Sequence, residues 1–164
     1  MEDAKTIGLP REAWGPRFWK ILHTLAECSG SYTNTILNND EIDAWCILLK
    51  SQYYVMPCAL CQQHYGKWLL SHKLDELKNT PVTERRNAIR TWLWACHSAV
   101  NTTNEKPSPS LEEMAAMYPK QSIEKEIVEL NSMFQIALNK RKLKLDDIGR
   151  WKLVIKRLRS MYGV

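Results

Sequence analysis

Apolar side chains recur every three or four residues along most of this chain, which is the spacing of one face of an α-helix. The first such run contains Phe18, Ile21, Leu22 and Leu25, and Trp14-Gly15-Pro16 precedes it as an opening turn. The run stops near Ser29-Gly30, where glycine favours a helix end. The pattern therefore predicts a first helix between these two turns.

Further helices are expected along the next ninety or so residues, because apolar side chains continue to recur along one helical face (an apolar stripe) and capping residues precede several of these runs. Asn38-Asn39-Asp40 offers a cap for the second, and Ser110-Leu111-Glu112-Glu113 has the order of a capped short helix. The predicted ranges are Glu41 to about Tyr53, Pro57 to about Leu70 or His72, Glu84 to Val100, and a short helix from Ser110 toward Met117. This predicts an all-α fold, a four-helix bundle plus a short fifth helix.

Two more helical stripes follow Pro119, one through Ile123 to Phe134 and a basic one through Leu145 to Leu158. We expect residues 120–164 to form a helical C-terminal extension to a domain spanning 1–119. This extension is either a helical hairpin on the bundle or a separate interaction element.

Composition fits this outline and narrows the class of protein. At 164 residues with 45% hydrophobic content, the chain is long enough for one buried core. Seven tryptophans against two phenylalanines are unusual and suggest either a planar ligand or a densely packed core. Met1 to Pro10 lacks the order of a signal peptide, and no apolar run approaches the ~18 residues of a membrane span.

The net charge of +5 is unevenly distributed. Basic residues crowd the carboxyl end: Lys140, Arg141, Lys142, Lys144, Arg150, Lys152, Lys156, Arg157 and Arg159. Such an end can meet an acidic partner, nucleic acid or a membrane surface, although a solvated basic helix packed by its apolar stripe is the default interpretation.

The candidate chemistry lies in Met56-Pro57-Cys58-Ala59-Leu60-Cys61-Gln62-Gln63-His64. Pro57 suits a helix start, which would put Cys58 among unsatisfied N–H groups at the positive end of the helix dipole. A thiolate is favoured there, with a lowered pKa. Cys61 lies one turn further within reach of a disulfide, and His64 follows on the same face.

Other interpretations of this motif stay open. Cys58, Cys61 and His64 could supply zinc ligands, although typical structural sites pair two doublets and no second doublet exists. Both cysteines could be plain apolar residues at a helix start. Gln62 stands where haem attachment needs histidine, and the surroundings lack the βαβ pattern of a thioredoxin.

Three separated clusters together resemble a known family. They are Trp14-Gly15, Trp19, Leu22-His23 and Ala26; then Pro57-Cys58-Ala59-Leu60-Cys61 with His64; then Trp92, His97, Val100-Asn101 and Lys106-Pro107. Their order and spacing over about residues 10–118 resemble the Erv/ALR family of flavin-dependent sulfhydryl oxidases, including the small versions made by large DNA viruses.

The resemblance implies a four-helix bundle with a short fifth helix that holds FAD noncovalently and commonly forms a homodimer. It implies a redox disulfide Cys58–Cys61, in which Cys58 exchanges with a substrate dithiol and Cys61 stacks against the flavin. Electrons would pass from the flavin to molecular oxygen, giving hydrogen peroxide. The cofactor supplies the redox chemistry, and the protein positions it.

The remaining clusters fit a FAD site on physical grounds. Trp92, His97 and Asn101 share a helix and could form a ridge that stacks on adenine and bonds the ribose. Lys106 could meet the pyrophosphate, and Trp14 and His23 would close the pocket, with Trp19 as a further candidate. The family resemblance adds His64 and Val100 to the expected set. Trp92 could instead be an ordinary core residue, and His23 and His97 could instead be buried histidines with satisfied hydrogen bonds.

The sequence departs from the family in three respects. Ser98 stands where asparagine usually follows the histidine, no long-range structural cysteine pair is present, and there is no second CxxC to act as a shuttle. Cys28, Cys46 and Cys96 are expected to be single buried thiols, with a pair or an intersubunit bridge as alternatives.

The sequence thus predicts a FAD-dependent thiol oxidase that makes disulfides for protein substrates or a thioredoxin-like relay. The expected location is the host cytoplasm or virion for a viral member, and the mitochondrial intermembrane space for a cellular one. The alternative is a zinc-stabilised helical module whose basic tail binds nucleic acid or another partner.

Overall fold

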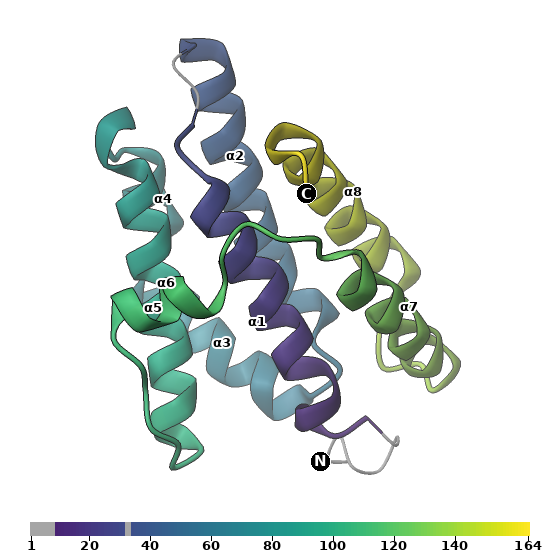
Figure 1. Cartoon of the computed structure of the whole chain (residues 1–164). Coiled ribbons are helices and arrows are strands. Elements are labelled where there is room, and N and C mark those ends of the chain that lie inside the picture. Colours follow the sequence, from purple (N-terminus) through teal and green to yellow (C-terminus); the bar gives the residue numbers. More distant parts are fainter. Residues whose placement is uncertain (1–8, 32–33) are drawn as a thin grey trace.

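The computed structural model describes residues 9–31 and 34–164, and every regular element in those ranges is helical. Figure 1 shows long helices packed side by side, with α3 crossing beneath them. The predicted all-α fold is confirmed.

The first two helices begin earlier than predicted. Helix α1 spans Arg11–Cys28 with Pro16 inside it, so the predicted opening turn at Trp14-Gly15-Pro16 is wrong. Pro10, at the cap position, precedes the helix instead, and Pro16 inside it lacks the N–H that would donate one backbone hydrogen bond. The predicted end near Ser29-Gly30 is confirmed.

Helix α2 spans Thr35–Gln52, and its cap is Asn34, not Asn38-Asn39-Asp40 as predicted. The Asn34 side chain accepts hydrogen bonds from the N–H groups of Ile36 and Leu37. A single 3₁₀ turn, η2 (Tyr53–Val55), then leads toward the two cysteines.

Helix α3 spans Ala59–Ser71, so its start lies one or two residues after the predicted Pro57 or Cys58. A short helix that the stripes did not predict, α4 (Leu74–Lys78), and the 3₁₀ turn η3 (Val82–Glu84) follow. Helix α5 spans Arg85–Thr103 and runs three residues past the predicted end at Val100.

The short helix α6 (Leu111–Met117) has the predicted capping box. Ser110 accepts from the Glu113 N–H, and the Glu113 carboxylate accepts from the Ser110 N–H. Two long helices then complete the chain: α7 (Glu124–Asn139) and α8 (Leu145–Tyr162).

Helices α7 and α8 pack directly on α1 and α2. Phe18 of α1 contacts both Phe134 of α7 and Trp151 of α8, with ring centroids 6.2 and 5.6 Å apart. Trp151 is completely buried. The extension therefore shares an apolar core with the first two helices, as in the hairpin-on-the-bundle alternative, while the division into 1–119 and 120–164 stays a prediction.

A buried polar network joins α8 to α2. The Tyr162 hydroxyl donates to the Glu41 carboxylate and accepts from Trp45 Nε1 at 2.9 Å. The same carboxylate accepts from the Gly30 N–H at 2.9 Å. Glu41 is only 2% exposed, so these bonds satisfy a charge that burial otherwise makes costly.

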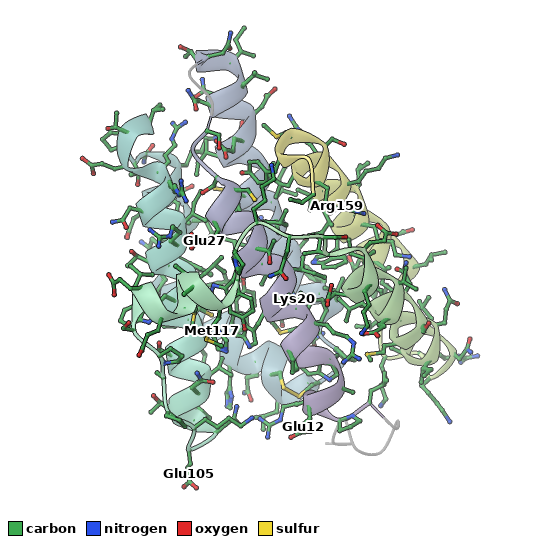
Figure 2. All side chains as sticks on the ribbon, viewed as in Figure 1. Glu12, Lys20, Glu27, Glu105, Met117 and Arg159 are labelled. Carbon is green, nitrogen blue, oxygen red and sulfur yellow. A yellow bond between two sulfur atoms is a disulfide. The ribbon has the colours of Figure 1, made fainter. Side chains whose placement is uncertain are left out.

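Ion pairs join α7 to α1 and α8. Figure 2 shows Lys20 on α1 facing α7, where it pairs with Glu126 at 2.5 Å. Arg159 of α8 pairs with Glu124 at 2.6 Å.

No helix among the described residues is long and apolar enough to cross a membrane.

Candidate functional site

A disulfide joins Cys58 and Cys61 at the start of α3, with Cα atoms 5.2 Å apart. Cys58 is the cap residue, and its sulfur accepts a hydrogen bond from the Cys61 N–H at 3.2 Å. This N–H is one of the donors that a helix start leaves unsatisfied. On reduction the same bond and the helix dipole favour a thiolate at Cys58.

The two sulfur-bearing residues differ in exposure. Cys58 is 7% exposed, whereas Cys61 is half-buried. Gln62 donates to the Met56 carbonyl at 3.0 Å and so holds the segment that precedes the disulfide. The disulfide is thus fixed from both ends of the turn.

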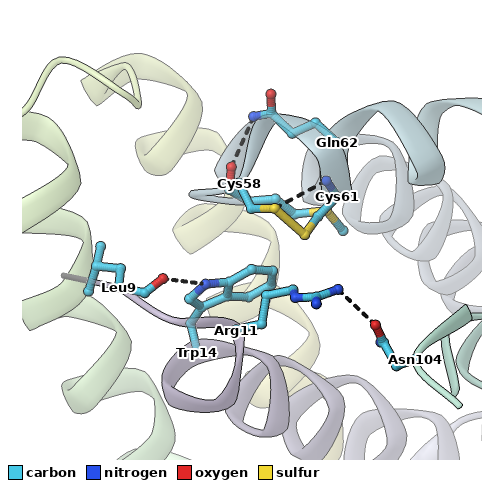
Figure 3. Close-up of a disulfide and its surroundings, with 8 residues drawn as sticks. Leu9, Arg11, Trp14, Cys58, Cys61, Gln62 and Asn104 are labelled. Atoms are coloured by element: carbon cyan, nitrogen blue, oxygen red, sulfur yellow. Dashed lines mark hydrogen bonds between the residues drawn. A yellow bond between two sulfur atoms is a disulfide. The ribbon is translucent and has the colours of Figure 1, made fainter. Parts of the chain in front are cut away.

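Trp14 lies beside this disulfide. Figure 3 shows its indole facing the two sulfurs, and its Nε1 donates to the Leu9 carbonyl at 3.3 Å. Arg11, three residues earlier on α1, donates to Asn104 at the end of α5 at 2.8 Å. The start of α1, the start of α3 and the end of α5 therefore surround the redox-capable bond.

A second group places His23 and His97 together between α1 and α5. Their ring nitrogens Nε2 and Nδ1 are 3.0 Å apart, within hydrogen-bond distance. Trp19 stacks on His97 at 4.0 Å between centroids, and Tyr118 stacks on His23 at 4.9 Å. Four flat rings thus form one cluster.

Burial keeps both imidazoles neutral near pH 7. Desolvation, with the neighbouring His97, lowers the pKa of His23 to about 3. Desolvation, with the charge of Lys106, lowers the pKa of His97 to about 4. A neutral pair can donate and accept hydrogen bonds without carrying charge into the interior.

A third group contains Trp92 and faces α3. Trp92 meets Trp68 edge to face at 5.9 Å, and its Nε1 donates to the His72 carbonyl at 3.4 Å. Trp68 in turn stacks on the His72 ring at 3.5 Å. Trp92 therefore contacts α3, whereas His97 on the same helix contacts α1.

The other predicted residues lie toward the end of α5 and on α3. Val100 and Lys106 are exposed, and Asn101 donates weakly to the Pro107 carbonyl at 3.5 Å. His64 is exposed one turn beyond Cys61. These side chains remain available to a ligand, in contrast to the packed His23.

Cys28, Cys46 and Cys96 are free thiols within this chain, so the prediction of single cysteines is confirmed at that level; Cys28 and Cys96 are buried as expected, whereas Cys46 is only partly buried. Burial raises the pKa of each. In the described part of the chain, no group of three or more His, Cys, Asp or Glu side chains could hold a metal ion. The zinc alternative therefore lacks a ligand cluster there.

A family model for the Erv1/Alr family matches residues 16–121, well over half of the chain. The chain belongs to the Erv1/Alr family. A FAD-linked sulfhydryl oxidase of African swine fever virus is 28% identical over 114 residues, which cover 70% of this chain and 86% of that protein. No solved structure matches significantly.

The Erv1/Alr match contains all the predicted site residues except Trp14, which lies just before it. It ends just before α7, so the hairpin of α7 and α8 lies outside the matched region.

Some residues around the Erv1/Alr site carried no sequence signal. Tyr118 follows the short helix α6 and Arg11 precedes the first cluster, so neither belongs to a recognisable spacing. Trp68 shows the helical spacing of α3, which an ordinary core residue would also show. Only the folded arrangement places them beside the predicted residues.

Proposed function

We propose that this chain oxidises dithiols of protein substrates through the Cys58–Cys61 disulfide and passes the electrons through FAD to oxygen. Membership of the Erv1/Alr family makes the chain a flavin-linked sulfhydryl oxidase, and its African swine fever virus relative carries that name. The observation that carries the proposal is the disulfide at the amino-terminal end of a helix, facing Trp14, inside the matched region.

The disulfide supports a two-step exchange. A substrate thiolate attacks the Cys58 sulfur, which forms a mixed disulfide and releases Cys61 as a thiolate. The second substrate thiol, once deprotonated, attacks its partner sulfur, and Cys58 leaves as a thiolate that the Cys61 N–H stabilises. The substrate gains a disulfide, and the enzyme holds the electron pair as two reduced cysteines.

The chemistry of the predicted site residues supports a FAD. Trp14 and Trp92 offer flat surfaces, the neutral His23–His97 pair offers hydrogen bonds, and Lys106 offers a positive charge for phosphate. Trp68 Nε1 and Ser98 Oγ are among the buried polar atoms that have no hydrogen-bond partner in the described structure. Such orphaned atoms are expected where a polar ligand binds.

We assign FAD contacts to residues of three helices and one loop, as the family resemblance implies: Trp14, His23, Cys61, His64, Trp92, His97, Val100, Asn101 and Lys106. When bound, FAD supplies the acceptor for the electron pair and its transfer to oxygen, which yields hydrogen peroxide. The protein's part is to hold Cys61 at the flavin and Cys58 at the substrate.

The decisive test uses the purified protein. It should be yellow, and it should consume oxygen and release hydrogen peroxide when given dithiothreitol. Cys58→Ser and Cys61→Ser should abolish turnover while FAD remains bound, because each removes one sulfur of the exchanging pair. Cys46→Ser is the matched control, since this free thiol lies on α2 and should leave turnover unchanged.

A colourless, well-folded protein that takes up no FAD would refute the proposal. Full activity in Cys58→Ser would refute the assigned exchange alone, because the flavin could then still be present.

The remaining assignments concern partners and location. We propose a homodimer, a protein dithiol or thioredoxin-like relay as substrate, and the host cytoplasm or virion as location, by analogy with the viral relative. Sedimentation of the purified protein at micromolar concentration tests the dimer directly.

A further inference from the structure

A groove of about 1090 Å³ lies between α2 and α8, on surface that the oxidase site does not use. Its walls carry exposed apolar side chains: Ile47 is 50% exposed, Tyr54 47% and Leu153 70%. Val154, 5% exposed, also lines it. Two packed antiparallel helices leave the kind of furrow in which the apolar face of a third helix fits.

The edges of this groove are positively charged. Lys50, Arg150, Lys156 and Arg157 line it, against the single acid Asp147. Lys50 and Lys156 make no ion pair with any residue that the structure describes. Arg157 pairs with Asp40 at 3.4 Å, but both side chains are about half exposed, so the pair is weak and exchangeable.

We propose that the α2–α8 groove binds an amphipathic helix of a protein partner, whose apolar face contacts Ile47 and Leu153 and whose flanking acids meet Lys50 and Lys156. Charge complementarity favours this occupant. A second copy of this chain would bring the same four cations against one another. Nucleic acid would leave the aliphatic walls unmatched, because bases stack on aromatic rings and only Tyr54 offers one.

One residue that lines the groove lies close to the disulfide in the chain. Tyr54 lines it, and Cys58 is only four residues further along the chain, so their Cα atoms lie at most about 14 Å apart. A partner held here brings a neighbouring dithiol segment near Cys58. This second step, in which the groove selects the thiol substrate, rests on the proposed oxidase function.

Binding can be measured with a designed peptide of about four helical turns. It carries leucines along one face, glutamates on both flanks and a fluorophore, and its twin carries lysines in place of the glutamates. Fluorescence anisotropy with the intact protein should show micromolar binding of the acidic peptide only, weakening as salt rises. Leu153→Asp and Lys156→Glu should each weaken binding tenfold or more.

Matched control variants place an apolar-to-Asp and a Lys-to-Glu substitution on α7, outside the groove. Val128→Asp and Lys125→Glu also change exposed residues, and they should leave the affinity within twofold of the parent chain. Equal binding of both peptides, or equal effects of groove and control substitutions, overturns the docking proposal. So does tighter binding of a single-stranded oligonucleotide, or a dimer that only the groove variants dissociate.

Substrate selection needs a second readout. The acidic peptide extended by Cys-Gly-Gly-Cys should be oxidised with a KM at least tenfold below that of dithiothreitol, and Lys156→Glu should raise this KM while kcat on dithiothreitol stays unchanged. An unchanged KM overturns selection by the groove. If the parent chain oxidises neither thiol, the oxidase function fails instead, and the anisotropy result still decides whether the groove binds the acidic helix.

Discussion

At the scale of single residues, the buried imidazoles His23 and His97 couple the candidate site to pH. Each takes a proton near pH 6.5 in an unfolded chain, but only near pH 3 and 4 in the folded one. Between these values the unfolded chain binds more protons, so the free energy of unfolding falls as the pH falls.

We expect the free energy of unfolding to fall by roughly 2 kcal/mol per histidine, and by up to roughly 4 kcal/mol for the pair, between pH 7 and pH 5, because the unfolded imidazoles take up protons in this range while the folded ones stay neutral. Urea denaturation at both pH values, with and without added FAD, measures it. In His23→Gln/His97→Gln the pH dependence should be smaller by that amount. If the free energy of unfolding of this variant fell as much between pH 7 and pH 5 as that of the parent chain, other titratable groups would be responsible.

Part of the candidate site could be predicted from the sequence, because its residue types are rare in combination. Cys58 and Cys61 have a spacing that allows a disulfide, and the structure joins them. His23 and His97 were expected from the family resemblance, and the structure brings their ring nitrogens Nε2 and Nδ1 to 3.0 Å from each other, a contact that was not predicted. Tyr118 could not be predicted, because stacking on His23 depends on where α6 ends relative to α1. No spacing within one helix encodes that distance.

At the scale of elements, the network that ends on Tyr162 fastens α8 to α2. Tyr162→Phe removes the hydroxyl but keeps the ring. It leaves Trp45 Nε1 without an acceptor and deprives the buried Glu41 carboxylate of one of its donors. We expect the free energy of unfolding to fall by about 1–3 kcal/mol in urea denaturation.

Tyr54→Phe is the control for this substitution. Tyr54 is 47% exposed, and loss of its hydroxyl should change stability by less than about 0.5 kcal/mol. Equal stability of Tyr162→Phe and the parent chain would mean that the network contributes nothing net.

Helix existence was easier to predict than helix starts. Apolar stripes persist over several turns, so the long helices were all expected, whereas a start depends on one capping side chain. Asn34 and Asn38 are chemically equivalent candidates, and the choice of Asn34 lets Asn38 be buried, where its backbone carbonyl accepts from the Arg85 guanidinium at 3.0 Å. That contact comes from a helix 47 residues away in the chain.

At the scale of the whole molecule, the carboxyl-terminal hairpin and the matched oxidase region share one core. The sequence left open whether residues 120–164 pack on the bundle, because a basic amphipathic helix has the same sequence pattern whether its apolar face packs on a partner or on its own chain. Phe134 and Trp151 against Phe18 decide in favour of the chain itself. The basic face of α8 consequently points outward, where it lines the groove.

This shared core predicts that a cut in the connection between α6 and α7 leaves the two parts bound. A protease site inserted after Pro119, in the exposed connection, would be cleaved in the folded protein. The hairpin should then co-elute with residues 1–119 in gel filtration, with helicity unchanged, because separation would expose Phe18 and Trp45 to water.

Phe134→Asp in the same cut chain provides the contrast, since a charge at a site 2% exposed should release the hairpin. A chain ending at residue 119 should aggregate for the same reason, with its share of the core uncovered. That shortened chain could instead stay soluble, helical and as active on dithiothreitol as the full chain. The hairpin would then be an appendage, and the α2–α8 groove would have to be reinterpreted as a contact between separable parts.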